Sequence, residues 1–265
     1  MSRISVIMGV YRPDRAMLTY SIRSVLDQDM PGLELIVCDD GSQDQTFEFL
    51  TKWAENEPRL KILRHGQNRG LAAALNTCLD CAGGEYIARQ DADDLSVPGR
   101  FAAQSDFLDA NPGLCFVGSA VRLFGGSGVW AVKAFPELPQ KRDFLFAVPF
   151  SHGSLMFRGN LLKKHRYRVD RFTRRAEDYE LLMRMYADGC FGANLTEPYY
   201  DYRDGGGMLS SMKYRRRMDA AVIRAKGFYR LGLYPAAIPY VIKPLIVGLI
   251  PLKLLNRLKR RHYRL

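Results

Sequence analysis

Apolar residues follow two different patterns along the first half of the chain. Short unbroken apolar runs, which favour buried strands, alternate with longer segments in which apolar residues return every three or four positions, as on one face of a helix. The runs predict strands at residues 4–10, 33–40, 60–64 and 85–90. The helical segments follow each strand in turn, at residues 15–28, 41–56, 70–82 and 96–111. This alternation predicts an α/β fold with a doubly wound, mostly parallel sheet flanked by helices.

Polar residues indicate where two of these helices begin. Ser42 or Asp44 can cap the second helix, because an oxygen there can accept a hydrogen bond from the first turn. Pro98 suits the first turn of the fourth helix, with Ser96 as its cap.

The second half of the chain predicts shorter elements. Strands are expected at 114–124, 129–134 and 153–158, and helices at 159–166 and 177–188. The stretch GGGMLSSM (205–212) predicts a flexible loop, and 213–230 a basic helix. The predicted organisation is one domain, 1–212, with halves at 1–112 and 113–212, followed by a helical, partly apolar tail at 213–265.

Acidic residues gather where the predicted strands end. ARQDADD (88–94) follows the fourth strand, and Asp39 and Asp40 end the second. Because ligands bind at the carboxyl ends of parallel strands, these acids are expected to meet on one edge of the sheet, beside Val10 and Tyr11.

Two interpretations of these acids remain open. Asp91 and Asp93 form an Asp-x-Asp pair whose oxygens suit Mg²⁺ or Mn²⁺. The structural alternative is an acidic turn in which Asp94 is a cap, together with helix capping by Asp40 and its neighbours. No G-x-G-x-x-G or Walker sequence follows the first strand, so neither a dinucleotide nor a P-loop site is indicated.

The charge of the chain is concentrated at its C-terminal end. The net charge is +11, yet residues 213–265 hold fourteen Lys and Arg residues and a single acid, Asp219, so residues 1–212 have a net charge of −2. The tail is also apolar but interrupted by prolines, and its longest uncharged stretch, 231–242, is too short to span a bilayer. We expect it to lie on an anionic membrane surface, at the cytosolic face. Packing on the domain itself is the alternative, and nucleic acid fits an apolar tail less well.

The cysteines indicate a cytoplasmic protein with reduced thiols. There are five, an odd number, and their spacing does not resemble a disulfide framework. Cys78-x-x-Cys81 stands without a second pair or nearby histidines, which argues against a zinc site.

Three segments carry a resemblance to a known family. They are SVIMGVYRPDRAMLTYSIRSVLDQDMPGLELIVCDDGSQDQT, NRGLAAALNTCLDCAGGEYIARQDADDLSVPGRFAAQSDFLDANP and AEDYELLMR. Together they resemble family 2 glycosyltransferases, inverting enzymes of the GT-A fold that use nucleotide-activated sugars. The resemblance covers residues 4 to about 203, and its motifs are several and in order.

The resemblance implies roles for the acids. It implies that Asp39 binds the nucleotide base, typically uracil, and that Asp91 and Asp93 lie at the ribose, diphosphate and metal centre. Arg89 would line the donor pocket. Asp178 would be the catalytic base, with Glu177 beside it; the structural alternative for this pair is a charged helix start.

Seven further positions are expected to contact the substrate. These are Val10, Tyr11, Arg12, Asp40, Asn68, His152 and Arg203. Arg12 stands where the family usually has Asn, and His152 can equally be a structural histidine. Arg174 and Arg175 are candidates to steer an anionic donor or an acceptor phosphate.

The implied reaction moves a sugar from a nucleoside-diphosphate sugar, of the UDP-sugar type, to a hydroxyl of a glycan or lipid-linked acceptor. It belongs to cell-surface polysaccharide or glycolipid biosynthesis. Inversion needs acids at a divalent cation and a separate base near the acceptor, which Asp91/Asp93 and Glu177/Asp178 can supply. The alternatives are a sugar-phosphate nucleotidyltransferase, which needs no separate base, and a catalytically silent, membrane-bound nucleotide-binding protein.

Overall fold

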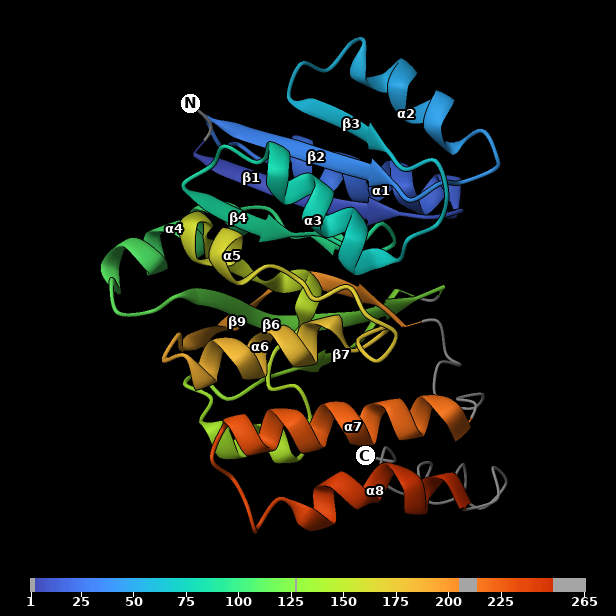
Figure 1. The fold of residues 1–265 in the computed structure, drawn as a ribbon. Coiled ribbons are helices and arrows are strands. Elements are labelled where there is room, and N and C mark those ends of the chain that lie inside the picture. The colour runs from blue at the N-terminus through green and yellow to red at the C-terminus, as the bar shows by residue number, and fades with distance from the viewer. Residues whose placement is uncertain (1–2, 127, 205–213, 250–265) are drawn as a thin grey trace.

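The computed structural model describes residues 3–126, 128–204 and 214–249, which form a sheet with helices on both sides (Figure 1). The strands are β1 (Ile4–Val10), β2 (Leu33–Asp39), β3 (Leu60–Arg64), β4 (Tyr86–Arg89), β5 (Leu95–Ser96), β6 (Phe116–Gly125), β7 (Gly128–Lys133), β8 (Met156–Arg158) and β9 (Gly192–Arg203). The helices are α1 (Arg15–Leu26), α2 (Thr46–Ala54), α3 (Leu71–Cys81), α4 (Arg100–Ala110), α5 (Gly159–His165), α6 (Glu177–Ala187), α7 (Tyr214–Arg230) and α8 (Ile238–Leu249), with short 3-10 helices η1 (Lys141–Leu145) and η2 (His152–Ser154). The predicted α/β class with a mostly parallel sheet is confirmed.

The strand order shows how the two halves of the chain share one sheet. In the described residues the order is β3-β2-β1-β4-β8-β6-β9-β5, with β7 paired to β6. The four N-terminal strands β1 to β4 run parallel, and β6 and β9 are parallel to each other. β8 runs antiparallel to both β4 and β6 and so joins the two parallel groups.

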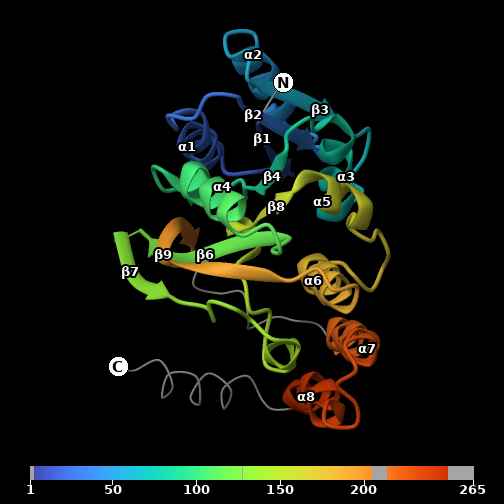
Figure 2. The same ribbon diagram turned by 90° about the vertical axis from the view of Figure 1, so that its left-hand side faces the viewer.

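Side-chain alternation along the strands divides the core between the two faces of the sheet. In β1, Val6 and Met8 join one hydrophobic cluster and Ile7 joins the other. Figure 2 shows α1 and α4 on one side of the sheet and α3, α5 and α6 on the other. Because both faces are covered, β1 and β2 are apolar along nearly their whole length, as the sequence pattern predicts.

The first part of the basic tail belongs to this core. The predicted basic helix is confirmed as α7, which buries Ile223 and Phe228 in the cluster that contains α6. Gly227 allows the close approach, because a Cβ there would lie 2.3 Å from the Met183 sulfur. Packing on the domain, the alternative to membrane contact, therefore holds for α7. Within the described ranges, no helix combines the length and apolar character needed to cross a bilayer.

Several local predictions were wrong. Of the two caps predicted for α2, Asp44 is borne out, since its Oδ1 accepts the N–H of Thr46, the first residue of the helix, at 3.0 Å. Ser42 is not a cap, because its hydroxyl accepts a hydrogen bond from the Arg12 N–H. α4 begins at Arg100 after Gly99, whose φ is 80°, and Ser96 lies in β5. β5 and β9 were not predicted at all, while the loop predicted at 205–212 falls outside the described residues.

A buried arginine joins the sheet to the connection after β4. Arg100 is fully buried, and burial lowers its pKa to about 10, so the guanidinium stays charged at neutral pH. Its N–H groups donate to Gln104 Oε1 (3.0 Å), Gln90 Oε1 (3.0 Å), Ser96 Oγ (2.9 Å), Arg89 O (2.9 Å) and Gly153 O (3.0 Å). One side chain therefore fixes the end of β4, the start of β5 and the segment before β8.

Replacing this arginine is expected to destabilise the fold strongly. Arg100→Met keeps much of the side-chain length but leaves several buried acceptors unpaired, and we expect a loss of about 3 kcal/mol or more in the free energy of unfolding. Chemical denaturation measures it. The matched control is Arg122→Met, which removes a half-exposed ion pair with Asp201 and should cost about 1 kcal/mol or less. Equal losses in the two variants would contradict the structural role of Arg100.

Candidate functional site

The carboxyl ends of β1, β2 and β4 meet on one edge of the sheet. Val10 pairs with Asp39, and the Asp40 N–H donates to the Val10 carbonyl at 2.8 Å. The Gln90 N–H donates to the carbonyl of Ile7 at 3.1 Å. The segments around residues 10, 39 and 90, which are far apart in the sequence, therefore lie side by side, as expected from parallel strands.

One carboxylate oxygen of Asp39 accepts a hydrogen bond, and the other has no hydrogen-bond partner. Its side chain is fully buried, and Oδ1 accepts the Ser42 N–H at 3.1 Å. Oδ2 has no hydrogen-bond partner, and the Arg64 Nε lies 3.7 Å away. Because buried polar atoms are nearly always hydrogen bonded, this oxygen is a candidate acceptor for an N–H of a ligand.

Asp40 holds the chain rather than facing a ligand. Its oxygens accept the N–H groups of Arg69 (2.9 Å) and Gly70 (2.7 Å) and contact His65 Nδ1 (2.7 Å). Gly41 (φ 75°) adds a close approach, since a Cβ there would lie 2.5 Å from the Gln67 backbone. These contacts fix the 65–70 segment, and with it the exposed Asn68, at the edge of the site.

The segment after β1 is open to solvent at this edge. Val10 is buried, whereas Tyr11 and Arg12 are exposed, and the Arg12 guanidinium lies 5.3 Å from the Tyr11 ring centre. Arg12 has a positive φ of 47°, uncommon for a residue with a side chain. Its N–H is held by Ser42, so the two strand ends are linked at this point.

Arg89 is a buried cation paired with the first acid of the Asp-x-Asp motif. Its side chain is fully buried, and Nη2 donates to Asp91 Oδ1 at 2.5 Å. The Arg89 Nε has no hydrogen-bond partner. The Asp91 side chain remains about 29 % exposed, so it faces both this arginine and the opening of the site.

The other two acids of the motif crowd against Asp91. Burial and the charge of Asp91 raise the pKa of Asp93, and the same two causes raise that of Asp94 well above its usual value. Asp94 is buried, and its Oδ1 accepts the Arg203 N–H at 2.7 Å. Asp94 therefore anchors β9 and does not cap the turn before Pro98.

This crowding fits a bound cation. Burial and the charge of Asp91 both disfavour ionised Asp93 and Asp94, and a divalent ion at Asp91 and Asp93 would offset the repulsion between these acids. Within residues 3–126, 128–204 and 214–249, no three His, Cys, Asp or Glu side chains converge as a complete metal site. Two carboxylates fit a cation whose remaining ligands come from the substrate and from water.

A second acidic pair opens α6. Burial, followed by the charge of Glu177, raises the pKa of Asp178 to about 6, although the Tyr179 N–H donates to its Oδ1 at 2.8 Å. Asp91 also contributes to this rise, so the two acidic groups act on each other electrostatically. Glu177 is buried, burial raises its pKa, and its Oε2 has no hydrogen-bond partner. A carboxylate whose pKa is near 6 is suited to accept a proton at neutral pH.

His152 is a neutral member of the site. Burial, followed by the charge of Arg89, lowers its pKa to about 3. Its Nε2 lies 2.9 Å from the Tyr167 hydroxyl, and Tyr167 is in turn held through its backbone by Asn76. His152 can therefore exchange a hydrogen bond here but cannot offer a positive charge to a phosphate.

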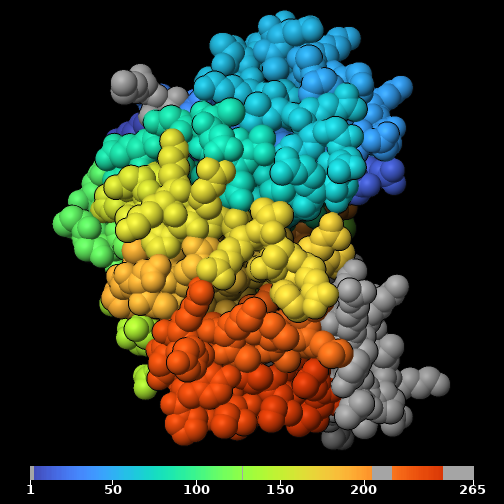
Figure 3. Space-filling view, in the orientation of Figure 1, coloured from blue at the N-terminus to red at the C-terminus, as the bar shows by residue number. Residues whose placement is uncertain are grey.

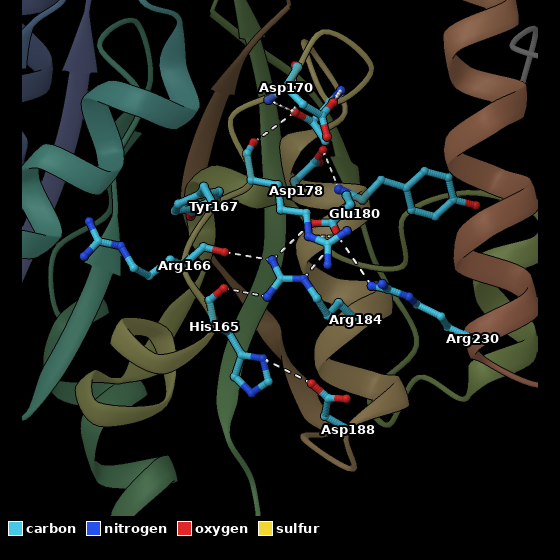
Figure 4. A network of polar contacts seen from close by, with 12 residues as sticks. His165, Arg166, Tyr167, Asp170, Asp178, Glu180, Arg184, Asp188 and Arg230 are labelled. Atoms are coloured by element: carbon cyan, nitrogen blue, oxygen red, sulfur yellow. Dashed lines mark hydrogen bonds and ion pairs between the residues drawn. The ribbon is translucent and has the colours of Figure 1, made fainter.

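Three of the predicted arginines, Arg174, Arg175 and Arg203, lie at the margin of the site. The Arg203 side chain reaches Asp14, with Nη2 3.7 Å from Oδ2, while its backbone N–H holds Asp94. Arg174 and Arg175 are exposed, and Arg174 Nε lies 4.0 Å from the Cβ position of Gly70. α6 begins two residues after Arg175. Figure 4 shows Asp178 and Tyr167 near the start of this helix.

The sequence did not reveal the residues that hold Asp91. The Tyr200 hydroxyl accepts the Asp91 N–H at 3.1 Å, and the Ser21 hydroxyl donates to the Asp91 carbonyl at 2.7 Å. Tyr200 is fully buried, and its hydroxyl also shapes the site. A Cβ at Gly153 would lie 2.2 Å from that hydroxyl, so only glycine fits there. No local pattern connects these distant positions.

Known proteins similar to this chain fall into one family. The profile described as "Glycosyl transferase family 2" matches residues 5–176. The protein named "Putative glycosyltransferase EpsE" of Bacillus subtilis is 36 % identical over 98 % of this chain and 94 % of its own length. The O-antigen biosynthesis glycosyltransferase WbnJ of Escherichia coli is 33 % identical over 76 % of this chain and 79 % of its own.

Solved structures share the fold. TarS 1–349 of S. aureus, in complex with UDP-GlcNAc, superposes with a TM-score of 0.71 at 20 % identity, over 92 % of this chain and 73 % of that one. The mannosyltransferase PcManGT from Pyrobaculum calidifontis, in complex with GDP-Man and Mn²⁺, gives a TM-score of 0.61 at 23 % identity, over 98 % and 79 %. The chain belongs to glycosyl transferase family 2 and is a glycosyltransferase.

Proposed function

We propose that this glycosyltransferase moves a sugar from a nucleoside-diphosphate sugar, of the UDP-sugar type, to a hydroxyl of a glycan or lipid-linked acceptor, with inversion. The observation that carries the proposal is that two acidic groups lie close enough to act on each other electrostatically. One group follows β4 and the other opens α6, and the charge of Asp91 reaches Asp178. An O-antigen enzyme among the relatives supports a role in cell-surface polysaccharide or glycolipid biosynthesis.

The donor is proposed to bind along the strand ends. The open Oδ2 of Asp39 is suited to accept an N–H of the nucleotide base, and Tyr11 offers an exposed ring beside it. UDP-GlcNAc and GDP-Man in the two similar structures support a nucleotide sugar as donor. Asp40 is proposed to act indirectly, by holding the 65–70 segment and Asn68 in place.

Asp91 and Asp93 are proposed to hold a divalent cation, Mn²⁺ or Mg²⁺. Such an ion, when bound, acts as a Lewis acid that neutralises the charge developing on the leaving diphosphate. Arg89 keeps Asp91 oriented through their 2.5 Å contact. The Mn²⁺ in PcManGT supports the choice of a divalent cation.

Asp178 is proposed to be the base that removes the proton from the attacking hydroxyl. Its pKa of about 6 leaves it ionised at neutral pH yet basic enough to accept a proton. Glu177 raises that pKa and so tunes the base. His152 and Tyr167 form a neutral hydrogen-bonded pair near Arg89, suited to position hydroxyl groups of the sugar or acceptor.

The nucleotidyltransferase alternative is disfavoured by the second acidic group. That reaction uses metal-bound carboxylates but has no need of a separate base such as Asp178. A catalytically silent nucleotide-binding protein would not need a buried carboxylate whose pKa is raised to about 6 either. Burying such an ionisable group lowers stability, so its presence favours a catalytic role.

The described end of the tail supports a peripheral membrane position at the cytosolic face. Ile238, Ile242 and Ile246 of α8 recur every four residues and are 46 %, 42 % and 56 % exposed. They form one face of the helix, and the net charge of +13 over 213–265 would attract anionic lipid.

Asp178→Asn is expected to lower sugar transfer by about 10²- to 10⁴-fold. In the wild type, kcat/KM should fall about tenfold per pH unit below about pH 6, because only the ionised base accepts a proton. Coupled assays that detect nucleoside diphosphate and pyrophosphate separately provide the measurement, and nucleoside diphosphate should be the product.

The stability of the same variant separates catalysis from structure. The folded state raises the pKa of Asp178 above its usual 3.8, so folding favours the protonated form and stability falls as pH rises between 3.8 and about 6. Asn removes that unfavourable charge, so the variant should be at least as stable as the wild type at pH 7. The control Asp188→Asn, at the exposed end of α6, should keep full activity. Unchanged turnover in Asp178→Asn would remove it from the base role.

Adding Mn²⁺ together with UDP is expected to raise the melting temperature by several degrees, because binding to the folded state stabilises it. Asp93→Asn should lose most of this shift, while Asp106→Asn, an exposed acid on α4, should retain it. Differential scanning fluorimetry with and without EDTA measures the effect. A full shift in Asp93→Asn would show that the cation binds elsewhere.

Ile242→Glu combined with Ile246→Glu is expected to weaken membrane binding at least tenfold, because each change removes apolar area that would enter the interface. Cosedimentation with vesicles of phosphatidylglycerol and phosphatidylcholine measures it. Val132→Glu, equally exposed on β7, is the matched control. Binding of the double variant at the wild-type level would contradict a role for this face.

A further inference from the structure

The segment that leads from α5 to α6 rests on α3, so the two halves of the chain are in direct contact here. On the molecular surface, the yellow segment after α5 lies against the teal surface of α3 (Figure 3). Arg166 follows α5 with a positive φ of 44°, and its guanidinium donates to Asp80 Oδ1 at 2.7 Å and to the Asn76 carbonyl at 3.0 Å. A helix of the N-terminal half therefore anchors this part of the C-terminal half.

Asn76 also holds the backbone of the next residue, Tyr167. The Asn76 Nδ2 donates to the Tyr167 carbonyl at 2.8 Å, and the Asn76 Oδ1 accepts the Tyr167 N–H at 3.0 Å. An amide side chain can donate and accept at the same time, which neither a carboxylate nor an apolar side chain can do. Both polar groups of one side chain thus bind one residue, and they fix the point from which the Tyr167 ring starts.

The Tyr167 side chain extends from this clamp into the candidate site. It is 3 % exposed, and its hydroxyl lies 2.9 Å from His152 Nε2. The two rings meet edge to face, with centres 5.6 Å apart. Among the described residues, His152 is the one hydrogen-bond partner of this hydroxyl. The contact therefore orients both rings relative to each other.

The pair lies close to both acidic groups of the site. The charge of Asp91 acts on His152, and the charge of Asp178 acts on Tyr167. The charge of Arg89 acts on both rings. A hydrogen-bonded pair in this position is near the proposed cation site at one end and near the proposed base at the other.

The partners of the two rings assign their protons. Burial raises the pKa of the Tyr167 phenol, and burial lowers that of His152 to about 3, so at neutral pH the phenol is protonated and the imidazole is neutral. A phenol with one acceptor in reach donates to it, so Nε2 of His152 accepts and the ring proton lies on Nδ1. The imidazole then presents a fixed N–H donor, which suits a substrate oxygen.

We propose that Asn76 and Tyr167 are positioning residues for sugar transfer and that they act through His152. Asn76 places the Tyr167 ring, the Tyr167 hydroxyl keeps the ring proton of His152 on Nδ1, and this N–H donates to an oxygen of the sugar or of the acceptor. The inference rests on the proposed function, since it assigns a task within sugar transfer. It adds two residues that do not themselves contact a substrate.

The tautomer of His152 tests the inference without any substrate. NMR spectra that correlate ring nitrogens with carbon-bound ring protons distinguish the two tautomers, and His152→Gln identifies the signals of this ring among the four histidines of the full-length protein. We expect the proton on Nδ1 in the wild type at pH 7, and a mixture of the two forms in Tyr167→Phe. Protonation at Nε2 in the wild type, or an unchanged spectrum in Tyr167→Phe, would overturn the proposal.

Turnover tests whether this orientation matters for transfer. Tyr167→Phe should lower kcat about tenfold, as expected when one hydrogen bond of the transition state is weakened, and should change the KM of the nucleotide sugar less than about twofold. The matched control is Tyr186→Phe, which removes a buried hydroxyl that donates to the Pro139 carbonyl at 3.1 Å and should keep kcat. A wild-type kcat in Tyr167→Phe would contradict the positioning role.

A double-mutant cycle separates positioning from a general effect on the fold. Because Tyr167 acts through His152, Tyr167→Phe should have little further effect on kcat when His152→Gln is already present. Asn76→Ala should likewise lower kcat in the wild type and have little further effect in the His152→Gln background. The control Asn111→Ala, which removes a hydrogen bond to the Phe107 carbonyl in α4, should keep kcat. Losses that multiply in the double variants would show independent effects and overturn the proposal.

The positioning inference and the proposed function can fail separately. If no nucleotide sugar yields nucleoside diphosphate, the proposed function fails, while the NMR spectra still decide whether Tyr167 sets the tautomer of His152. If transfer proceeds but the tautomer is unchanged in Tyr167→Phe, the positioning inference alone is wrong.

Discussion

The buried ion pair between Arg89 and Asp91 is the constraint on which the site depends. A fully buried guanidinium is unfavourable unless it is paired and hydrogen bonded, and Arg89 has a carboxylate on one side while its Nε remains without a partner. In contrast, Arg100 donates hydrogen bonds to the end of β4, to β5, to α4 and to the segment before β8. Arg100 thus fixes the backbone around the end of β4. Arg89 supplies a positive charge that acts on Asp91, Asp93 and Glu177.

The acids differ in function because they differ in their partners. Asp40 is saturated by N–H groups and shapes a loop, whereas Asp39, in the next position, keeps one oxygen open. Asp94 is buried against the β9 backbone, whereas Asp91 and Asp93 face outward from the same turn. Glu177 contributes a charge that raises the pKa of Asp178. Each carboxylate therefore acquires a distinct role from its surroundings, although the residue types are nearly the same.

The C-terminal region combines a helix that packs in the core with a helix that exposes an apolar face, and composition alone does not distinguish the two. α7 contributes Ile223 and Phe228 to the core and is part of the domain. α8 leaves an apolar face exposed, formed by Ile238, Ile242 and Ile246. α7 therefore packs with the domain, although its charge resembles that of the rest of the tail. A basic sequence can cover a core with its apolar residues while directing its charges outward.

The sequence by itself determined the alternation of strands and helices, the sheet edge where the acids meet and the acids proposed to act, because periodicity and strand ends are local properties. Four strands of the first half were predicted within one residue at each end. β9 was missed, since its polar residues and Pro198 do not form a typical strand pattern and it is held by pairing with β6. Only the tertiary structure decided that Tyr200 holds Asp91, that His152 stays neutral and that Asp178 has a pKa near 6. These properties arise from burial and from charges brought together across the fold, which no single stretch of sequence contains.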